Sequence, residues 1–492
     1  MSEGRRSADV IVIGGGIHGC STALHCAMRG LSVILIEKDH AGRHASGVNA
    51  GGVRQLARHV AEIPLSNTSM ALWHNIADLV DDDCGFTSDG QVLVAEDEAD
   101  LEGCRARVAD LTLRGFHHEE MIDAKELRSI VPAVSETCPG GVISRRDGAA
   151  IPLRATQAFK RKAESLGAII REGVRVTKVE QDGPNWRVVT DAGDFLTPRI
   201  VNAAGAWADR IASDLGEPVL FDVIAPMLMI TAPLPAFIKP VVILRGRKLS
   251  FKQFDNGTVL IGGGHLGTPL RDENVTLLDW KKLAISAGTV WDLFPIMRGA
   301  PVVRAWAGIE ARMPDDLPVF GRSAKHDGVY HQFGFSAHGF QLGPGAGAVM
   351  AEIIATGRSA SASPVSPPPP ELQRRRRPMA IKRSIRTPIQ NRIVETGNLV
   401  FVGGVIADDT TQSMGPQTQN ILGKIEGYLG EVGLDRKAIV AAQIFVTDLS
   451  QKKEMDAAWT GFFGEDMPTR ATVGVADLGG GAIIEIVVTA AR

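Results

Sequence analysis

The N-terminal segment alternates between two short apolar runs and one amphipathic stretch. Residues 9–13 (DVIVI) form an apolar run of strand length after the leading aspartate, and residues 31–36 form a second run. Between them, apolar side chains recur at helical spacing from Ile17 to Met28. Continuous apolar strands are typical of a parallel sheet that is buried on both faces. The pattern therefore predicts a β-α-β unit at residues 9–39.

A glycine-rich loop, residues 14–19 (GGGIHG), joins the first predicted strand to the helix. In this GxGxxG pattern, Gly14 allows the tight turn, Gly16 lets the backbone approach a pyrophosphate, and Gly19 permits close packing of the helix. The helix N-terminus supplies unpaired N–H groups to the phosphates. Glu37 ends the second strand, where its carboxylate accepts hydrogen bonds from ribose hydroxyls and repels a 2′-phosphate. We expect a dinucleotide site here, and the unit by itself suits either NAD or FAD.

A change in composition divides the chain before its last quarter. Residues 359–378 contain four consecutive prolines and the run Arg374–Arg377, and they offer little apolar surface to bury. Proline runs favour extended polyproline II, so we predict an exposed, semi-stiff linker whose arginines are solvated. The alternative use of the arginine run is contact with an anionic partner. Residues 379–492 are enough for one more compact domain.

Composition and charge limit the classes of function. The 492 residues exceed one ordinary core and predict two or three domains. Apolar residues make up 44% and charged residues 22%, as in soluble globular proteins, and a net charge of −3 offers no general attraction to nucleic acid or acidic membranes. No apolar run approaches the roughly 20 residues that span a bilayer. The five cysteines include no CxxC pair, so we expect neither a disulfide framework nor a metal site, and we predict a cytoplasmic location.

Four separated segments resemble the D-amino-acid oxidase family, which includes the glycine and sarcosine oxidases. They are residues 42–54 (GRHASGVNAGGVR), 201–207 (VNAAGAW), 304–321 (RAWAGIEARMPDDLPVFG) and 334–345 (GFSAHGFQLGPG). The resemblance spans residues 8–358 and implies FAD as the cofactor. It also implies an α/β, Rossmann-like FAD-binding domain with an α+β substrate domain. The FAD-binding parts are expected at 8–90, 146–215 and 300–358, and the substrate sheet at 91–145 and 216–299.

The same resemblance implies which residues contact FAD. Small residues in 42–54 allow the backbone to approach a flat ring. A helix expected from Pro344 to Ile354 would stabilise negative charge on the N1–C2=O edge of the reduced flavin. The expected cofactor contacts are Gly14, Gly16, Ile17, His18, Gly19, Glu37, Lys38, Ala45, Ser46, Asn49, Gly51, Gly52, Val176, Ala204, Gly205, Trp207, Gly339, Phe340 and Gln341.

Candidate substrate contacts lie in the same segments or directly after them. They are Arg54, Arg58, Glu310, Arg312, His338 and Gln341. Arginine suits a substrate carboxylate, and because the flavin takes a hydride, no side-chain acid or base is required. Glu310 stands where the glycine-oxidase branch has an arginine, a departure that resembles the opine- and proline-type dehydrogenases. It either recognises a second amine or guanidinium on the substrate or forms a structural ion pair with Arg304 or Arg312. His338 either tunes the charge of the flavin or has a packing role.

The C-terminal residues, 379–492, resemble the reactive-intermediate deaminase (Rid) family over nearly their whole length. Strand-like runs at 397–404 and 439–449 and helical spacing at 417–429 and 455–463 accompany this resemblance. It implies an α+β, chorismate-mutase-like fold and a trimer with its site between subunits. We therefore expect a homo-oligomer.

The Rid resemblance also implies two catalytic residues. Arg470, in PTRAT, would fix the carboxylate of a 2-imino acid, and Glu485, in IIEI, would help to place the hydrolytic water. Glu485 is alternatively a buried structural acid. Gln390 replaces the family's tyrosine, and Gly403 replaces its serine. Two alternatives therefore stay open for this domain, catalytic imine hydrolysis or a non-catalytic module for trimerisation or ligand binding.

Together the two resemblances predict an enzyme that catalyses two consecutive reactions. The first domain would oxidise an amino acid, with D-amino acids favoured, or a secondary amine to an imine. The Rid domain would hydrolyse the imine to a 2-oxo acid and ammonia. Because the two domains are tethered, the local concentration of the site that accepts the imine is raised. The alternative is a flavin dehydrogenase that passes electrons to another carrier, with the Rid domain as a non-catalytic module. The expected partners are a small amine substrate and either O2 or another electron acceptor.

Overall fold

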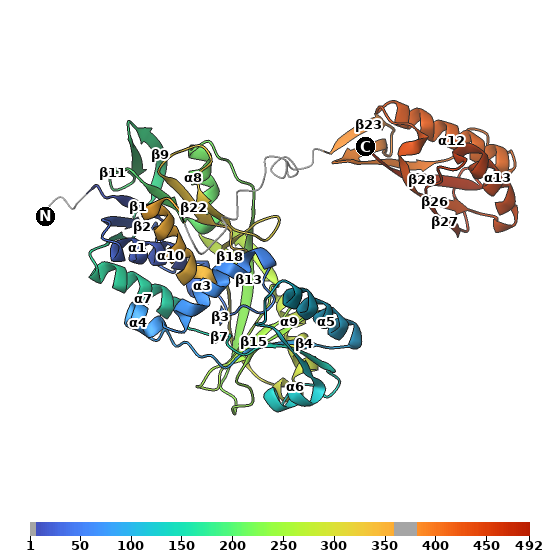
Figure 1. The fold of residues 1–492 in the computed structure, drawn as a ribbon. Coiled ribbons are helices and arrows are strands. Elements are labelled where there is room, and N and C mark those ends of the chain that lie inside the picture. The colour runs from blue at the N-terminus through green and yellow to red at the C-terminus, as the bar shows by residue number, and fades with distance from the viewer. Residues whose placement is uncertain (1–5, 359–380) are drawn as a thin grey trace. The chain divides into compact units, whose positions relative to one another are not determined.

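The computed structural model describes residues 6–358 and 381–492. These residues fall into two compact units, one on each side of the segment between them. The predicted linker 359–378, with its run Arg374–Arg377, lies outside the described residues. Each unit has its own sheets and helices (Figure 1). Within the two described ranges, no helix is both long and apolar enough to cross a membrane.

The predicted β-α-β unit lies in a six-stranded, mainly parallel sheet of order β21-β22-β12-β1-β2-β8. β1 (Val10–Ile13) pairs in parallel with β2 (Val33–Ile36) and with β12 (Ile200–Asn202), and all three strands are buried. The outer strands are β8 (Ile169–Arg171), β21 (Val319–Arg322) and β22 (Val329–Phe333). Burial on both faces explains why the first strands read as continuous apolar runs.

Glycines let the last helix of this unit, α10 (Gly339–Thr356), approach its neighbours α1 (Ile17–Met28) and α3 (Ile63–Trp73). A Cβ on Gly343 would lie 2.8 Å from the Ile17 side chain, and one on Gly347 would lie 2.1 Å from the Ser21 hydroxyl. The prediction that α10 begins near Pro344 is wrong, because the proline lies inside the helix. Close packing against both neighbours keeps the segment helical on both sides of Pro344. The rule that proline marks the start of a helix does not take such packing into account.

Shorter elements complete the FAD-binding half. The helices are α2 (Ala45–Val48), α4 (Ile76–Val80), α7 (Pro152–Ser165) and α8 (Ala208–Asp214). A three-stranded sheet is formed by β9 (Val176–Asp182), β10 (Asn185–Thr190) and β11 (Phe195–Thr197), and a two-stranded one by β3 (Gly52–Val53) and β7 (Gly148–Ala149).

A second, larger sheet of the same unit carries the substrate side. Its strands are β4 (Gln91–Ala95), β5 (Glu120–Asp123), β6 (Gly140–Ser144), β13 (Asp222–Thr231), β14 (Val241–Leu244), β15 (Ser250–Gln253), β16 (Val259–Gly262), β17 (Leu266–Leu270), β18 (Val275–Leu277), β19 (Val302–Ala307) and β20 (Glu310–Arg312). The long strand β13 pairs with both β19 and β20. The helices α5 (Glu98–Leu113), α6 (Ala124–Ile130) and α9 (Trp280–Leu293) belong to this part. Residues from two stretches of the chain thus build one sheet. The second stretch extends beyond the predicted bound of 299 to Arg312, because β19 and β20 pair with β13.

The C-terminal unit is a six-stranded sheet of order β23-β24-β25-β28-β26-β27. The strands are β23 (Lys382–Arg386), β24 (Asn391–Thr396), β25 (Leu399–Val405), β26 (Ile439–Val446), β27 (Thr469–Gly474) and β28 (Ile484–Ala491). The helices α12 (Met414–Gly430) and α13 (Lys452–Phe463) pack on the face that carries Ile444, Ile486 and Val488. The opposite face exposes apolar side chains, including Phe401 at 39% and Val473 at 46%.

Candidate active site

The loop between β1 and α1 approaches neighbouring backbone closely. Gly14 has a φ of 110°, and a Cβ there would lie 2.4 Å from the Ala203 carbonyl oxygen. A Cβ on Gly19 would lie 1.9 Å from the Gly14 carbonyl oxygen. Both positions therefore require glycine. Gly14 and Gly16 line a cavity at the N-terminus of α1, where backbone N–H groups favour an anion.

Glu37 follows β2 and is held at the rim of this loop. Its Oε2 accepts a hydrogen bond of 2.6 Å from Gly15 N, and its Oε1 accepts one of 2.8 Å from Asp39 N. Burial raises the pKa of Glu37, and the two backbone donors oppose that shift. Each carboxylate oxygen keeps a second lone pair, so the group remains able to accept a hydrogen bond from a hydroxyl in the cavity.

One continuous cavity of about 960 Å³ extends from the glycine loop into the substrate side. The predicted cofactor contacts that line it are Gly14, Gly16, His18, Glu37, Lys38, Ala45, Ser46, Asn49, Gly51, Gly52, Val176, Ala204, Gly205, Trp207, Gly339 and Phe340. The predicted substrate contacts that line it are Arg54, Arg58, Glu310, Arg312 and His338. A cavity that is lined by both a nucleotide-type loop and charged side chains suits an extended dinucleotide together with a substrate.

Three predicted contacts do not line the cavity, and this corrects the roles we expected for them. Ile17 is buried, and its N–H donates to Ser46 Oγ at 2.9 Å. Gly19 faces the Gly14 carbonyl instead of the cavity. Gln341 is completely buried; its Oε1 accepts from Arg58 Nη2 and from Ser66 Oγ, both at 3.1 Å. Gln341 is therefore a positioning residue for Arg58.

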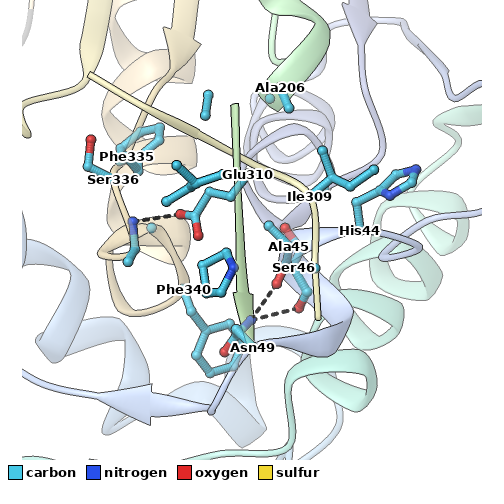
Figure 2. Close-up of a pocket in the computed structure, with 18 of the residues that line it drawn as sticks. His44, Ala45, Ser46, Asn49, Ala206, Ile309, Glu310, Phe335, Ser336 and Phe340 are labelled. Carbon is cyan, nitrogen blue, oxygen red and sulfur yellow. Dashed lines mark hydrogen bonds between the residues drawn. The ribbon is translucent and has the colours of Figure 1, made fainter. Parts of the chain in front are cut away.

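The segment that contains α2 forms one wall of the cavity (Figure 2). Asn49 Nδ2 donates to the carbonyl oxygens of Ala45 at 2.9 Å and Ser46 at 3.2 Å. Gly51 N then donates to Asn49 Oδ1 at 2.7 Å. These bonds fix a short, small-residue wall that leaves room for a flat ring, as the resemblance to flavoenzymes implies.

Glu310 is the first residue of β20, and its side chain reaches into the cavity between Phe335 and the α2 segment (Figure 2). One carboxylate oxygen accepts a hydrogen bond of 2.6 Å from Ala337 N. Burial raises the pKa of Glu310 to about 7, although that hydrogen bond opposes the shift. The predicted alternative of an ion pair with Arg304 or Arg312 is wrong. Arg312 pairs with Asp316 at 2.8 Å, and no cation among the described residues lowers the pKa of Glu310.

Two arginines, Arg58 buried and Arg54 half-buried, line the same cavity. Arg58 is 1% exposed, and burial together with the charge of Arg54 lowers its pKa to about 9. Its Nη2 donates to the His338 carbonyl oxygen at 3.0 Å as well as to Gln341, whereas its buried Nη1 has no hydrogen-bond partner among the described residues. Arg54 Nη1 donates to the Leu56 carbonyl oxygen at 2.5 Å. Both arginines line the cavity, and a guanidinium suits a carboxylate ligand.

Glu62 is a buried acid that sequence reasoning missed. Its Oε2 lies 3.3 Å from His338 Nδ1, and it belongs to a short 3-10 helix directly after the arginines. Burial opposes its ionisation, yet His338, Arg58 and Arg54 hold the pKa of Glu62 below its ordinary value. Burial also lowers the pKa of His338. Glu62 and His338 therefore face each other next to the two arginines.

A second residue that sequence reasoning missed is Lys252 on β15. It is 5% exposed, and its Nζ lies 3.0 Å from the place a Cβ on Gly51 would occupy and 4.7 Å above the Phe254 ring. Burial lowers the pKa of Lys252 to about 7. The signal was present in the sequence, because a lysine stands between the apolar residues of the segment 249–254 (LSFKQF).

The two predicted catalytic residues of the C-terminal unit lie on opposite faces of its sheet. In the register of β26, Arg470 is opposite Ala442 and Glu485 is opposite Phe445. Cross-strand partners share a face, and residues three apart on one strand do not. Arg470 accordingly contacts α13, where its Nη2 donates to Asp456 Oδ1 at 2.6 Å. Within one protomer the two side chains therefore do not share a site.

Glu485 lies on the open face over the Gly403–Gly404 bulge of β25. A Cβ on Gly404 would lie 1.6 Å from Glu485 Oε1, so this carboxylate occupies the space that glycine leaves. The Gln390 side chain reaches the same place, with its Oε1 3.2 Å from where a Cβ on Gly403 would be. Arg392 Nη1 donates to the Gly404 carbonyl oxygen at 2.6 Å. Gln390 and Gly403, the two departures from the Rid pattern, thus adjoin the acid.

Residues 9–353 match the family model described as FAD dependent oxidoreductase, and residues 387–492 match the model described as Endoribonuclease L-PSP. The beta subunit of sarcosine oxidase from Rhodobacter capsulatus is 24% identical over 367 residues, which cover 73% of this chain and 87% of that protein. The glycine oxidase of Geobacillus kaustophilus is 24% identical over 361 residues, which cover 70% of this chain and 92% of that protein. The structure of L-proline dehydrogenase from P. horikoshii matches with a TM-score of 0.68 and 27% identity, covering 73% of this chain and 96% of that one.

Proposed function

The chain belongs to the FAD dependent oxidoreductase family, and on that premise we propose that it oxidises an amino acid or a secondary amine to an imine. Both family resemblances inferred from the sequence are confirmed, as is FAD as the cofactor. The observation that carries the proposal is the continuous cavity, which joins the glycine loop and Glu37 to Arg54, Arg58 and Glu310.

The residues of the cavity suit this cofactor. Gly14 and Gly16 line the cavity at the N-terminus of α1, where backbone N–H groups suit a pyrophosphate, and Glu37 lines it where a carboxylate suits ribose hydroxyls. Bound FAD supplies the redox chemistry by accepting the hydride from the carbon that bears the nitrogen. The wall from Ala45 to Asn49 would lie along the ring.

The charges at the far end of the cavity support a zwitterionic substrate. Arg58 offers a free N–H to a carboxylate, and Gln341 and the His338 carbonyl oxygen fix its orientation. Glu310 offers a carboxylate oxygen to a cation, either an ammonium or a guanidinium. A substrate that carries both charges is bound by both groups, and orientation of the reacting carbon follows from that two-point contact.

The test is anaerobic bleaching of the yellow, FAD-loaded protein by matched D- and L-amino acids and by N-methylated amines. Our sequence prediction favours the D-enantiomers, and the relative bleaching rates of each pair decide it. Arg58→Lys removes the planar donor and is expected to raise the concentration of a carboxylate substrate needed for half-maximal bleaching. If no amine or amino acid bleaches the flavin, the substrate class is wrong.

Two electron acceptors remain candidates, O2 in an oxidase and another carrier in a dehydrogenase. After anaerobic bleaching, admission of air separates them. Reoxidation within one turnover with stoichiometric peroxide supports the oxidase, and slow reoxidation that an added artificial acceptor accelerates supports the dehydrogenase.

For the C-terminal unit we propose hydrolysis of the imine, with a homotrimer as the assembly. Support comes from the apolar side chains that the sheet exposes opposite its helices, since a second copy would cover them. The Rid resemblance implies a site between subunits, in which Arg470 of one protomer would act with Glu485 of another. Arg470→Ala is expected to leave flavin bleaching intact and to lengthen the lifetime of the released imine. Arg436→Ala, at an arginine that lies over Phe462, is the matched control. An unchanged imine lifetime in Arg470→Ala favours the non-catalytic module.

We also propose a cytoplasmic location. The five cysteines are free and buried, and a chain with this pattern is compatible with a reducing compartment.

A further inference from the structure

The carboxylate of Glu310 is held in place at the reaction end of the cavity. One oxygen accepts the Ala337 N–H at 2.6 Å, and the turn that presents this donor has two non-glycine residues in the left-handed region, Ser336 at φ 50° and Ala337 at φ 65°. Such a turn persists only where the surrounding structure fixes it. Among the described residues, no cation pairs with the carboxylate, so the second oxygen is available to a ligand in the cavity.

Glu310 lies close to the wall that lines the flavin ring. The loop before it meets the α2 segment, because a Cβ on Gly308 would lie 2.5 Å from Val48 and 3.6 Å from Ala45. Figure 2 shows the Glu310 side chain between the Phe335–Ser336 turn and this segment. A cation held by Glu310 is therefore next to the place of oxidation and not at a remote end of the substrate.

The three histidines that line the cavity either pair with an acid or resist protonation. His44 pairs with Asp39 at 3.0 Å, and His338 pairs with Glu62. Burial lowers the pKa of His18, which stacks on Phe335 at 3.8 Å, to about 3. These groups are poor proton acceptors at neutral pH.

Charged groups on the elements around Glu310 have other partners or lie across the cavity. They are Arg312 on β20, paired with Asp316; Asp222 on β13, opposite Arg312 in the strand register; His338 after the turn, paired with Glu62; His44 beside α2, paired with Asp39; and Arg54 and Arg58 in the cavity wall. The titration of Glu310 thus reflects its burial and its bond to Ala337 more than a specific charge.

We propose that Glu310 binds the reacting ammonium and accepts one of its protons, which makes it a catalytic residue of the oxidation. The inference rests on the proposed function. An N–H bond of the ammonium breaks, and the proton goes to the free oxygen of Glu310. The nitrogen lone pair forms the C=N bond as the hydride leaves the α-carbon with its electron pair for the oxidised flavin, and an iminium ion results. The proton on Glu310 then leaves to water. The sequence alone did not require such a base.

The pH dependence of anaerobic bleaching tests this role, with the fastest substrate of the amine panel. With Glu310 as the base, the second-order bleaching constant of the wild-type protein is flat between about pH 7 and the pKa of the substrate ammonium, and it falls about tenfold per pH unit below that range. Glu310→Gln has no base at this position, so it reacts only with the fraction of the substrate that is a neutral amine in solution. Its constant therefore rises about tenfold per unit throughout, with a deficit of about 10²-fold at pH 7 that shrinks as the pH increases.

Two further variants separate catalysis from structure. Glu310→Asp keeps a carboxylate and is expected to retain the plateau of the wild-type profile at a lower rate. Glu102→Gln, at an exposed acid on α5, is the matched control and should reproduce the wild-type profile. A structural role would lower the rate equally at every pH, so parallel profiles for wild type and Glu310→Gln would overturn the inference. So would a loss of preference for basic amino acids with an unchanged profile, which is the result that a second-amine site predicts.

Proton release on binding gives a second readout that needs no turnover. The probe is 2-aminoisobutyrate, an ammonium that lacks an α-hydrogen, titrated by calorimetry in buffers of different ionisation enthalpy. A carboxyl that titrates at about 7 must lose its proton to hold the ammonium. We expect wild type to release more protons at pH 6 than at pH 8, and we expect no release from Glu310→Gln. Equal release at both pH values in the wild-type protein would overturn the inference even if the Gln variant does not fold.

The two proposals fail in different ways. If no amine bleaches the wild-type flavin, the proposed function is wrong and the role of Glu310 falls with it. If amines bleach the flavin but the profiles are parallel, the proposed function stands and only the role of Glu310 is wrong.

Discussion

Lys252 is expected to destabilise the folded FAD-binding unit at neutral and acidic pH. Its Nζ lies beside Gly51 and over the Phe254 ring, and among the described residues no carboxylate pairs with it. Burial lowers its pKa from 10.5 to about 7. The folded state therefore binds fewer protons than the unfolded chain between these two pH values, and the free energy of unfolding rises with pH through that window.

The size of the effect follows from the gap between the two pKa values. At about 1.4 kcal/mol per unit, a fall from 10.5 to about 7 corresponds to about 5 kcal/mol at most. Lys252→Met keeps the length of the side chain and removes the buried charge, which is often stabilising. We expect the variant to be more stable than wild type by about 3–5 kcal/mol at pH 6, and the advantage to vanish by about pH 10.5.

Urea unfolding of the FAD-loaded protein, followed by flavin fluorescence, reports on this unit alone. Wild type and Lys252→Met are compared at pH 6.5 and 9.5, with Lys281→Met, at an exposed lysine on α9, as the matched control. The control should keep the wild-type difference between the two pH values. A Lys252→Met protein that is no more stable than wild type, or that keeps the same difference, would refute the reasoning.

Three other changes have definite expected outcomes. Gly19→Ala places a Cβ 1.9 Å from a carbonyl oxygen of the glycine loop, so the purified variant should lack bound FAD by absorbance; a full flavin complement would contradict this. Gln341→Leu leaves Arg58 Nη2 without a side-chain acceptor, at a cost of about 1.5–3 kcal/mol, and should weaken benzoate binding about tenfold or more in a flavin difference titration; unchanged affinity would show that Arg58 needs no such support. Gly404→Ala must displace Glu485, so it should slow imine decay without changing the bleaching rate, and an unchanged decay would exclude Glu485 from hydrolysis.

The local pattern of the first segment was sufficient to predict its structure. β1, the glycine loop and α1 are adjacent in sequence, and their apolar periodicity and glycine spacing act over a few residues. The position of Glu37 at the end of β2 follows from the same short-range rule. These features do not depend on how distant segments meet.

The environments of Glu310 and Gln341 depend on such distant contacts and could not be predicted. Ala337 reaches Glu310 through a turn that α10 and β22 position, and Arg58 reaches Gln341 across more than 280 residues of sequence. The start of α10 was predicted wrongly for the same reason, because packing against the distant helices α1 and α3 determines where α10 begins.

The motifs also did not predict to which face of the sheet Arg470 and Glu485 point. A motif identifies residue types, whereas the register of β26 with both of its neighbours decides that these two side chains point apart. Only a prediction of strand order and register would have revealed it.

The central claim is that this chain removes a hydride from a carbon that bears nitrogen. The most direct test compares anaerobic bleaching of the FAD-loaded protein by an amino acid and by the same compound deuterated at the α-carbon. We predict bleaching that is slower by several-fold with the deuterated compound, because the C–H bond breaks as the flavin is reduced. A flavin that dithionite reduces but that no amine or amino acid bleaches would contradict the account.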